Sequence, residues 1–192
     1  ADGPTLVRGL QDGERDVALI EDQVTDGRLP GWQQTPIFED ELVLIAPTGH
    51  PWAGQGDLAP ATLLEGPIIF RQLGSPTRRL IIERIARAGL DPDGLLTLFE
   101  LGNTEAIKRA VMAGLGVGWV SRYACALERQ AGWITEIAVT GLQISRPLIL
   151  VSRPPELVPR NQQRLLEVLT SDGWLPDPLR CVRPGTVPGA AR

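Results

Sequence analysis

Two short polar motifs in this 192-residue chain carry the side chains best suited to hold a small ligand. The first, Ser-Pro-Thr-Arg, spans residues 75–78, and the second is Asn103-Thr104; each follows a short apolar run. Because Ser and Asn are preferred N-cap residues and Pro is favoured in the first turn, each motif predicts a helix start. A helix N-terminus also attracts carboxylate or phosphate oxygens. The motifs therefore indicate either ligand-binding helix starts or simple helix caps.

A glycine run at Gly114, Gly116 and Gly118 raises the alternative of a phosphate-binding loop. A dinucleotide-binding fingerprint needs a strand before its glycines and a helix directly after them. Here the order is reversed, since the helical pattern of residues 104–113 comes first and the strand pattern of residues 117–121 follows. The run therefore predicts a helix stop at Gly114 and a closely packed strand start at the other two glycines.

Residues typical of catalysis or metal binding do not form a recognisable set. The single histidine, His50, lies in a turn where it can satisfy local backbone groups, and no second His or Cys stands near it at metal-ligand spacing. General acid–base catalysis would need paired carboxylates, but Asp40 and Glu41 are adjacent strand residues and point to opposite faces. Glu39, Asp40 and Glu41 therefore suggest the solvated start of a strand. We therefore expect no metal, no cofactor and no enzymatic activity.

The composition favours a globular protein that touches neither membranes nor nucleic acid. A net charge of -4 disfavours contact with a phosphate backbone, which requires a concentrated basic surface. No apolar run approaches the roughly 18 residues that a membrane span requires. The first residues show no signal-peptide pattern, so a cytoplasmic location is expected. Cys125 lies in a helical pattern and is expected to be buried, whereas Cys181 lies in a loose tail.

Apolar runs and helical periodicity predict alternating strands and helices. The expected strands span residues 15–21, 40–47, 67–70, 95–101, 117–121, 134–139 and 146–152. The expected helices span residues 5–12, 76–88, 104–113, 122–130 and 160–170. Such alternation implies an α/β fold with a parallel-rich sheet and helices on both faces. Residues 22–36 are polar and turn-rich, and the Pro/Gly-rich segment 171–192 predicts a flexible tail.

Several stretches together resemble the effector-binding domain of LysR-type transcription regulators. They are FEDELVLIAPTGHPWAG, IIFRQLGSPTRRLIIERIARAGL and ELGNTEAIKRAVMAGLGVGWVSRYA, with LVRGLQDGERDVALIED similar to the start of that domain. The resemblance covers about residues 5–170 and implies a two-lobed fold similar to type-2 periplasmic binding proteins, with Rossmann-like lobes and two crossover strands. Lobe one is expected from residues 1–47 and 147–170, and lobe two from residues 48–146.

The resemblance also implies an effector in the cleft between the lobes. The expected contacts lie at helix or strand starts of lobe two: Ser75, Thr77, Arg78, Asn103, Thr104, Val117 and Gly118. Residues 116–118, which include Val117 and Gly118, match a loop that often approaches the ligand by its backbone. Pro76 stands where the family often has a small residue, and it removes one N–H donor from this anion-binding helix start.

By this resemblance the chain is the sensing and dimerising part of a bacterial regulator, a homodimer or homotetramer that binds a small polar metabolite, with anions among the candidates. DNA is expected to be bound only through a helix-turn-helix domain absent from this chain. The opening strand, helix and second strand of lobe one are also expected to be missing, which predicts exposed sheet edges. The alternatives are a solute-binding receptor of a transporter and an enzyme on a similar two-lobed fold.

Overall fold

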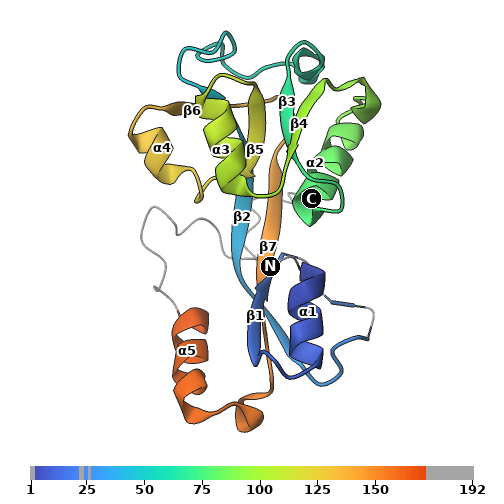
Figure 1. Ribbon diagram of the computed structural model, residues 1–192, viewed down its shortest axis with the longest axis vertical. Helices are drawn as coiled ribbons and strands as arrows, with labels where there is room; N and C mark the ends of the chain where they lie inside the picture. Colours follow the sequence, from blue (N-terminus) through green and yellow to red (C-terminus); the bar gives the residue numbers. More distant parts are fainter. Residues whose placement is uncertain (1–2, 22–23, 26, 172–192) are drawn as a thin grey trace, which may run out of the picture. The chain divides into compact units, whose positions relative to one another are not determined.

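The computed structural model describes residues 3–21, 24–25 and 27–171, which form two compact α/β units (Figure 1). Unit 2 is Glu41–Ser145, and unit 1 is formed by the chain on either side of it. The chain passes from one unit to the other along β2 (Gln33–Pro47) and again along β7 (Ile144–Ser152). The first boundary lies before the predicted residue 47, because the carboxyl-terminal half of β2 pairs with strands of unit 2.

Unit 2 is built on a mixed sheet with the strand order β6-β2-β5-β3-β4. The strands β3 (Ile68–Arg71), β4 (Thr97–Leu101) and β5 (Val117–Ser121) run parallel to one another. β2 is antiparallel to β5 and to β6 (Ile134–Ile137). The sheet thus keeps the predicted parallel centre, and a long antiparallel strand joins it on one side.

Helices cover both faces of this sheet (Figure 1). α2 (Pro76–Arg87) packs on one face, and α3 (Thr104–Met112) packs on the other, the face that also carries Cys125 just before α4 (Ala126–Gln130). Two short 3-10 helices, Pro60–Leu64 and Pro92–Gly94, complete the connections on the α2 side. The described residues contain no helix long and apolar enough to cross a membrane.

The two faces follow directly from the alternation of side chains along each strand. In β3, Ile68 and Phe70 join the cluster that contains Ile81 of α2, whereas Ile69 joins the cluster that contains Ile107 of α3. All five of these side chains are at most 2 % exposed. Strands buried on both faces are expected to be apolar throughout, and this explains why their positions could be predicted from apolar runs.

The glycine run between α3 and β5 has the structural roles predicted for it. Gly114 follows the end of α3 with a φ of 76°, in the left-handed region that glycine adopts at helix ends. A Cβ atom at Gly116 would lie 2.6 Å from the Pro67 carbonyl oxygen. One at Gly118 would lie 2.8 Å from Cγ2 of Ile107 and 3.0 Å from the Ile69 carbonyl oxygen. These glycines let α3 and β3 approach β5 closely.

Unit 1 contains α1 (Gly3–Gln11), β1 (Val17–Ile20) and α5 (Arg160–Thr170), together with parts of β2 and β7 and a short 3-10 helix, Pro155–Leu157. β1 pairs antiparallel with β7. Its core holds Val7, Leu10, Ala18, Ile20, Leu29, Ile149 and Val151. In the described part of the chain β1 ends the sheet, and its Leu19 side chain is 43 % exposed.

Two predictions about unit 1 are wrong. β2 begins at Gln33, inside the segment predicted to be turns, because glutamines and a proline conceal the apolar pattern of a strand there. Asp40 is 1 % exposed, and its Oδ2 accepts hydrogen bonds from Nε and Nη2 of Arg146 at 3.0 and 2.8 Å. Its charge is therefore paired inside the protein and not solvated. Beyond Ser171, the predicted tail and Cys181 lie outside the described residues.

Lys108 of α3 is a buried cation that fixes the α3 side of unit 2. Its side chain is 6 % exposed, and Nζ lies 2.7 Å from Glu105, 2.7 Å from Glu128 and 2.6 Å from the Ala124 carbonyl oxygen. Burial alone would lower the pKa of Lys108, but its hydrogen bonds with the two glutamates outweigh burial and raise it. The hydrogen bond from Lys108 is also the main cause of the lowered pKa of Glu128.

Adding a methyl group within the glycine run tests its packing role. We expect Gly118→Ala to destabilise the chain by about 1–3 kcal/mol, because the added methyl group must displace Ile107 or the Ile69 backbone. Gly3→Ala is the matched control, since a Cβ atom there meets nothing within 4 Å. Urea unfolding of the two variants measures the difference. Equal midpoints would contradict the packing role.

Lys108→Met is expected to lower the free energy of unfolding by about 3–5 kcal/mol, because Glu128 loses its buried partner. The pKa of Glu128 lies below its ordinary 4.5 in the folded state, so the pair stabilises at higher pH and this contribution disappears as the pH falls through the lowered pKa. The variant should therefore show a smaller loss of stability between neutral and acid pH. Adding Glu128→Leu should recover part of the stability. Urea unfolding from pH 3 to 7 provides both readouts.

Candidate ligand-binding site

The carboxyl ends of β3 and β4 bring the two predicted polar motifs to one edge of unit 2. Arg71, the last residue of β3, pairs with Leu101, the last residue of β4. The Gln72 N–H continues this pairing with a 3.0 Å hydrogen bond to the Leu101 carbonyl oxygen. The loops that lead to Ser75 and Asn103 therefore leave the sheet side by side. In open α/β sheets this edge is the usual place for ligands.

Ser75 occupies the N-cap position of α2, as predicted, but its hydroxyl group does not cap the helix. Its backbone is extended, with φ -67° and ψ 127°, and its side chain forms no cap hydrogen bond. The residue is 7 % exposed, and Oγ is buried without a hydrogen-bond partner among the described residues. An unpaired buried hydroxyl costs about 1–3 kcal/mol, so Ser75 would gain from a hydrogen bond that the described residues do not supply.

The first turn of α2 holds the other two predicted residues, with different surroundings. Thr77 is buried at 5 % exposure. Arg78 lies 2.6 Å from Glu100 of β4, donates to the Arg71 carbonyl oxygen at 3.2 Å, and stands 5.4 Å from the ring centre of Phe70. Because the charge of Arg78 is paired, this residue serves to hold α2 against β3 and β4.

Asn103 forms the predicted cap of α3. Its Oδ1 accepts a hydrogen bond from the Ala106 N–H at 2.8 Å. Asn103 is exposed, and Thr104, which begins the helix, is half-buried. Since the cap uses the oxygen of the amide, its Nδ2 group can donate to an acceptor from solvent or from a ligand.

Val117 and Gly118 do not lie at this edge. They pair with Ile68 and Ile69, in the first half of β3, and therefore lie toward the opposite end of the parallel strands. Val117 is 1 % exposed and belongs to the core on the α2 face. The structure thus gathers Ser75, Thr77, Arg78, Asn103 and Thr104 and leaves these two in packing roles. Arg71 also lies at this edge, at the end of β3, and was not predicted. Its position directly after the predicted strand of residues 67–70 is the sequence signal that could have identified it.

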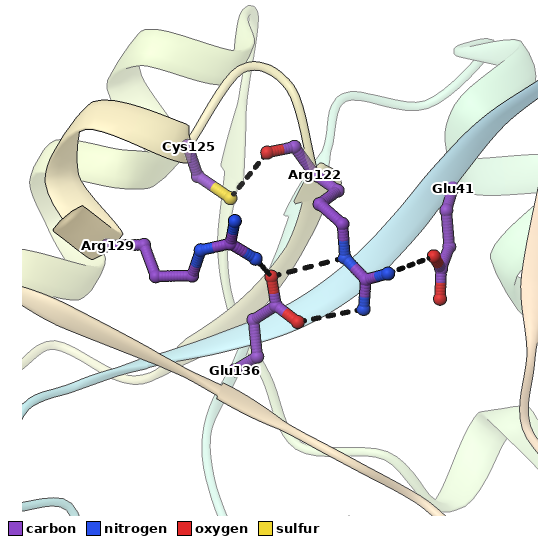
Figure 2. Close-up of polar contacts among 5 residues, drawn as sticks. All are labelled: Glu41, Arg122, Cys125, Arg129 and Glu136. Atoms are coloured by element: carbon purple, nitrogen blue, oxygen red, sulfur yellow. Dashed lines mark hydrogen bonds and ion pairs between the residues drawn. The ribbon is translucent and has the colours of Figure 1, made fainter. Parts of the chain in front are cut away.

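Arg122, just after β5, is the centre of an ion-pair network (Figure 2). Its guanidinium contacts Glu41 of β2 and lies 2.8 Å from Glu136 of β6, which Arg129 of α4 also contacts. A cavity of about 800 Å³ beside the network is lined by Glu41, Arg122, Glu136 and Trp119, among others. Since its single arginine is paired, this cavity offers no unpaired cation to an anionic ligand.

The cysteine and the histidine, side chains often used in catalysis or redox sensing, are held by burial and by hydrogen bonds with the backbone. Cys125 is fully buried, donates to the Arg122 carbonyl oxygen at 3.4 Å, and has its pKa raised to about 11, mainly by burial (Figure 2). It is therefore a protonated thiol at neutral pH and a poor nucleophile. Nδ1 of His50 accepts from the Trp52 N–H at 3.2 Å, and burial lowers the pKa of this histidine. The described residues include no cluster of three metal-ligating side chains.

Comparison with known proteins places the chain among regulators. Residues 1–173 match the LysR substrate binding domain. The chain is 30 % identical to the HTH-type transcriptional regulator CbbR of Xanthobacter flavus, over 96 % of this chain and 56 % of that protein. It is also 30 % identical to a probable RuBisCO transcriptional regulator of Trichormus variabilis, over 91 % of this chain and 53 % of that protein. The chain thus spans about half the length of the curated relatives that it matches.

Solved structures share the fold at lower sequence identity. The regulatory domain of CcmR from Synechocystis in complex with 2-PG superposes with a TM-score of 0.76 and 23 % identity, over 88 % of this chain and 79 % of that one. The effector binding domain of QuiR in complex with shikimate gives a TM-score of 0.70 and 15 % identity, over 88 % and 77 %. Motifs, family match and fold agree, and the chain belongs to the LysR substrate-binding domain family.

Proposed function

We propose that this chain senses a small polar metabolite at the carboxyl edge of β3 and β4 and thereby controls a LysR-type transcription regulator. The observation that carries the proposal is the Ser75 hydroxyl group, which is buried at this edge without a hydrogen-bond partner. Asn103 begins the neighbouring helix from the same edge. The ligands of two structural relatives, 2-PG and shikimate, support a small polar effector.

The helix starts explain why the ligand is polar. The first turns of α2 and α3 present backbone N–H groups and the positive ends of two helix dipoles, which favour oxygen atoms that carry negative charge. Pro76 removes one of these N–H groups from α2, so the Ser75 hydroxyl becomes more important as a donor. Within the set predicted from the sequence, we therefore assign ligand contacts to Ser75, Thr77, Asn103 and Thr104.

Sensing requires that the effector bind one conformation of the regulator more tightly than another. The difference in affinity then shifts the population toward that conformation, and by linkage it changes the affinity for DNA. We propose that DNA is bound by a separate helix-turn-helix domain of the whole regulator, in the cytoplasm. The curated relatives are named as transcriptional regulators, which favours this role over a transport receptor or an enzyme.

We also propose that unit 2 contributes a surface for self-association along β4. This strand pairs with β3, and its other edge has no partner strand in the part of the chain that the structure describes. Leu98 and Phe99 of β4 are 44 % and 42 % exposed, and Leu96, just before the strand, is 55 % exposed. An apolar edge strand of this kind is a template for pairing with a second copy.

Ser75→Ala separates ligand binding from folding. We expect the variant to keep or raise the unfolding temperature of the free chain, because it removes an unpaired buried hydroxyl group. It should raise the dissociation constant for a stabilising effector about tenfold, which corresponds to about 1.4 kcal/mol of binding free energy. Thermal shift and calorimetry with 2-PG, shikimate and other small organic acids measure both effects.

Ser145→Ala is the matched control for this prediction, because Ser145 is exposed and distant in sequence from the proposed contacts. It should change neither the unfolding temperature nor the dissociation constant. If no small polar compound stabilises the chain, or if Ser75→Ala leaves its affinity unchanged, then the ligand site is not at this edge.

Leu98→Lys tests the proposed self-association. A charge on the β4 edge should raise the dissociation constant of the dimer at least tenfold, since edge lysines oppose strand pairing. Leu127→Lys is the matched control, because Leu127 is 78 % exposed on α4 and lies outside β4. Sedimentation velocity over a range of protein concentrations distinguishes them. Equal dissociation constants for the two variants would exclude β4 from the interface.

A further inference from the structure

We propose that Arg71 binds the anionic group of the effector, and that the effector is therefore a carboxylate or a phosphate. The proposal rests on the function proposed above and adds to it the charge of the ligand and the residue that recognises it. Arg71 ends β3 at the carboxyl edge, four positions before Ser75 in the sequence. It was not among the contacts that the sequence and the family resemblance suggested.

The alternation of side chains places Arg71 on the α3 face of the sheet. In β3, Ile68 and Phe70 belong to the cluster under α2, and Ile69 belongs to the cluster under α3. Arg71 therefore shares the face of Ile69. Its partner across the strand pair, Leu101, also packs against the cluster under α3. The arginine thus lies beside the loop that leads from β4 into the first turn of α3.

The guanidinium group of Arg71 lacks an acidic partner. No side chain among the described residues forms an ion pair or hydrogen bond with it, and its Nε atom is buried without an acceptor. Two acids on the neighbouring elements β4 and α3 are already paired: Glu100 lies 2.6 Å from Arg78, and Glu105 lies 2.7 Å from Lys108. A buried N–H group of a cation without an acceptor is unfavourable. Arg84, in the last turn of α2, also has such an Nε atom, so what distinguishes Arg71 is its position at the carboxyl edge, where an anion could approach its guanidinium group.

The contrast between Arg71 and Arg78 defines their different roles. Glu100 pairs with Phe70 along the strands and so lies on the α2 face, where Arg78 neutralises it. On the α3 face the corresponding strand position holds Leu101, which cannot pair with Arg71. The positive charge of Arg71 and the positive dipole end of α3 therefore accumulate at one edge. Arg can hold a carboxylate or a phosphate by two parallel hydrogen bonds, which suits this position to a small acid.

Arg71→Gln tests the proposal in the full chain, with inorganic phosphate, 2-PG, shikimate and the neutral methyl ester of shikimate as probes. Arg164→Gln is the control, because it removes the same charge from an exposed position of α5. Titration calorimetry at constant ionic strength measures each dissociation constant. We expect at least one acid to bind the original chain, and Arg71→Gln to raise the dissociation constant of that acid at least tenfold. If shikimate is that acid, its methyl ester should bind at least tenfold more weakly. Arg164→Gln should change the dissociation constant of the acid by less than twofold.

If phosphate and 2-PG bind but shikimate does not, the anionic group of the effector is a phosphate. If shikimate binds but phosphate and 2-PG do not, it is a carboxylate. Arg71→Lys keeps the charge without the planar fork, and we expect it to bind the acid with intermediate affinity even if Arg71→Gln is poorly folded. The proposal is overturned, and the sensing function stands, if neutral polar compounds bind as well as the acids or if both Arg71 variants bind the acids normally. Both proposals fail if none of the acids or neutral compounds binds the original chain.

Discussion

The close packing of α3 against β5 at Gly118 is the constraint on which the rest of unit 2 depends. There is no room for a Cβ atom at this position between Ile107 of α3 and the Ile69 backbone of β3. Because α3 must therefore lie close to the sheet, its first turn has a fixed place at the carboxyl edge, next to the end of β3. Gly114 allows the sharp turn that connects this helix to β5. The glycines thus position the candidate site from a distance.

The carboxyl edge gathers two buried polar groups that lack partners. Several other charges of unit 2 are paired, as Lys108 is with Glu128 and Arg122 is with Glu41 and Glu136 (Figure 2). Away from the edge, Arg84 Nε and Glu128 Oε2 are single atoms without a hydrogen-bond partner in the described part of the chain. At the edge, the Ser75 hydroxyl and the Arg71 Nε are both buried without partners. Native proteins rarely leave such groups unpaired, and the exceptions concentrate where a ligand completes them. Two unpaired groups at one sheet edge therefore favour a binding role over a folding defect.

Much of unit 2 could be predicted from the sequence because the residues that mark its helix starts and ends act locally. The cap at Asn103, the proline at the start of α2 and the glycine after α3 all act within a few residues. What could not be predicted depends on partners far away in the chain. The pairing of Asp40 with Arg146 joins residues on two different strands, and the polar beginning of β2 is a strand only because of its neighbours. The two helix starts of the candidate site could be predicted for the same reason, since their signals are local, but the lack of an acidic partner for Arg71 is visible only in three dimensions.

The described titratable groups indicate what kind of signal the chain can receive. The pKa of Cys125 is raised to about 11 and that of His50 is lowered, mainly by burial, which favours the neutral thiol and the neutral imidazole. A sensor that used either residue would require the opposite shift, toward a thiolate or an imidazolium ion. Arginine, in contrast, keeps its charge at every physiological pH. We therefore propose that an edge built on Arg71, Ser75 and two helix dipoles responds to the presence of an acid, and not to a change in the protonation of Cys125 or His50.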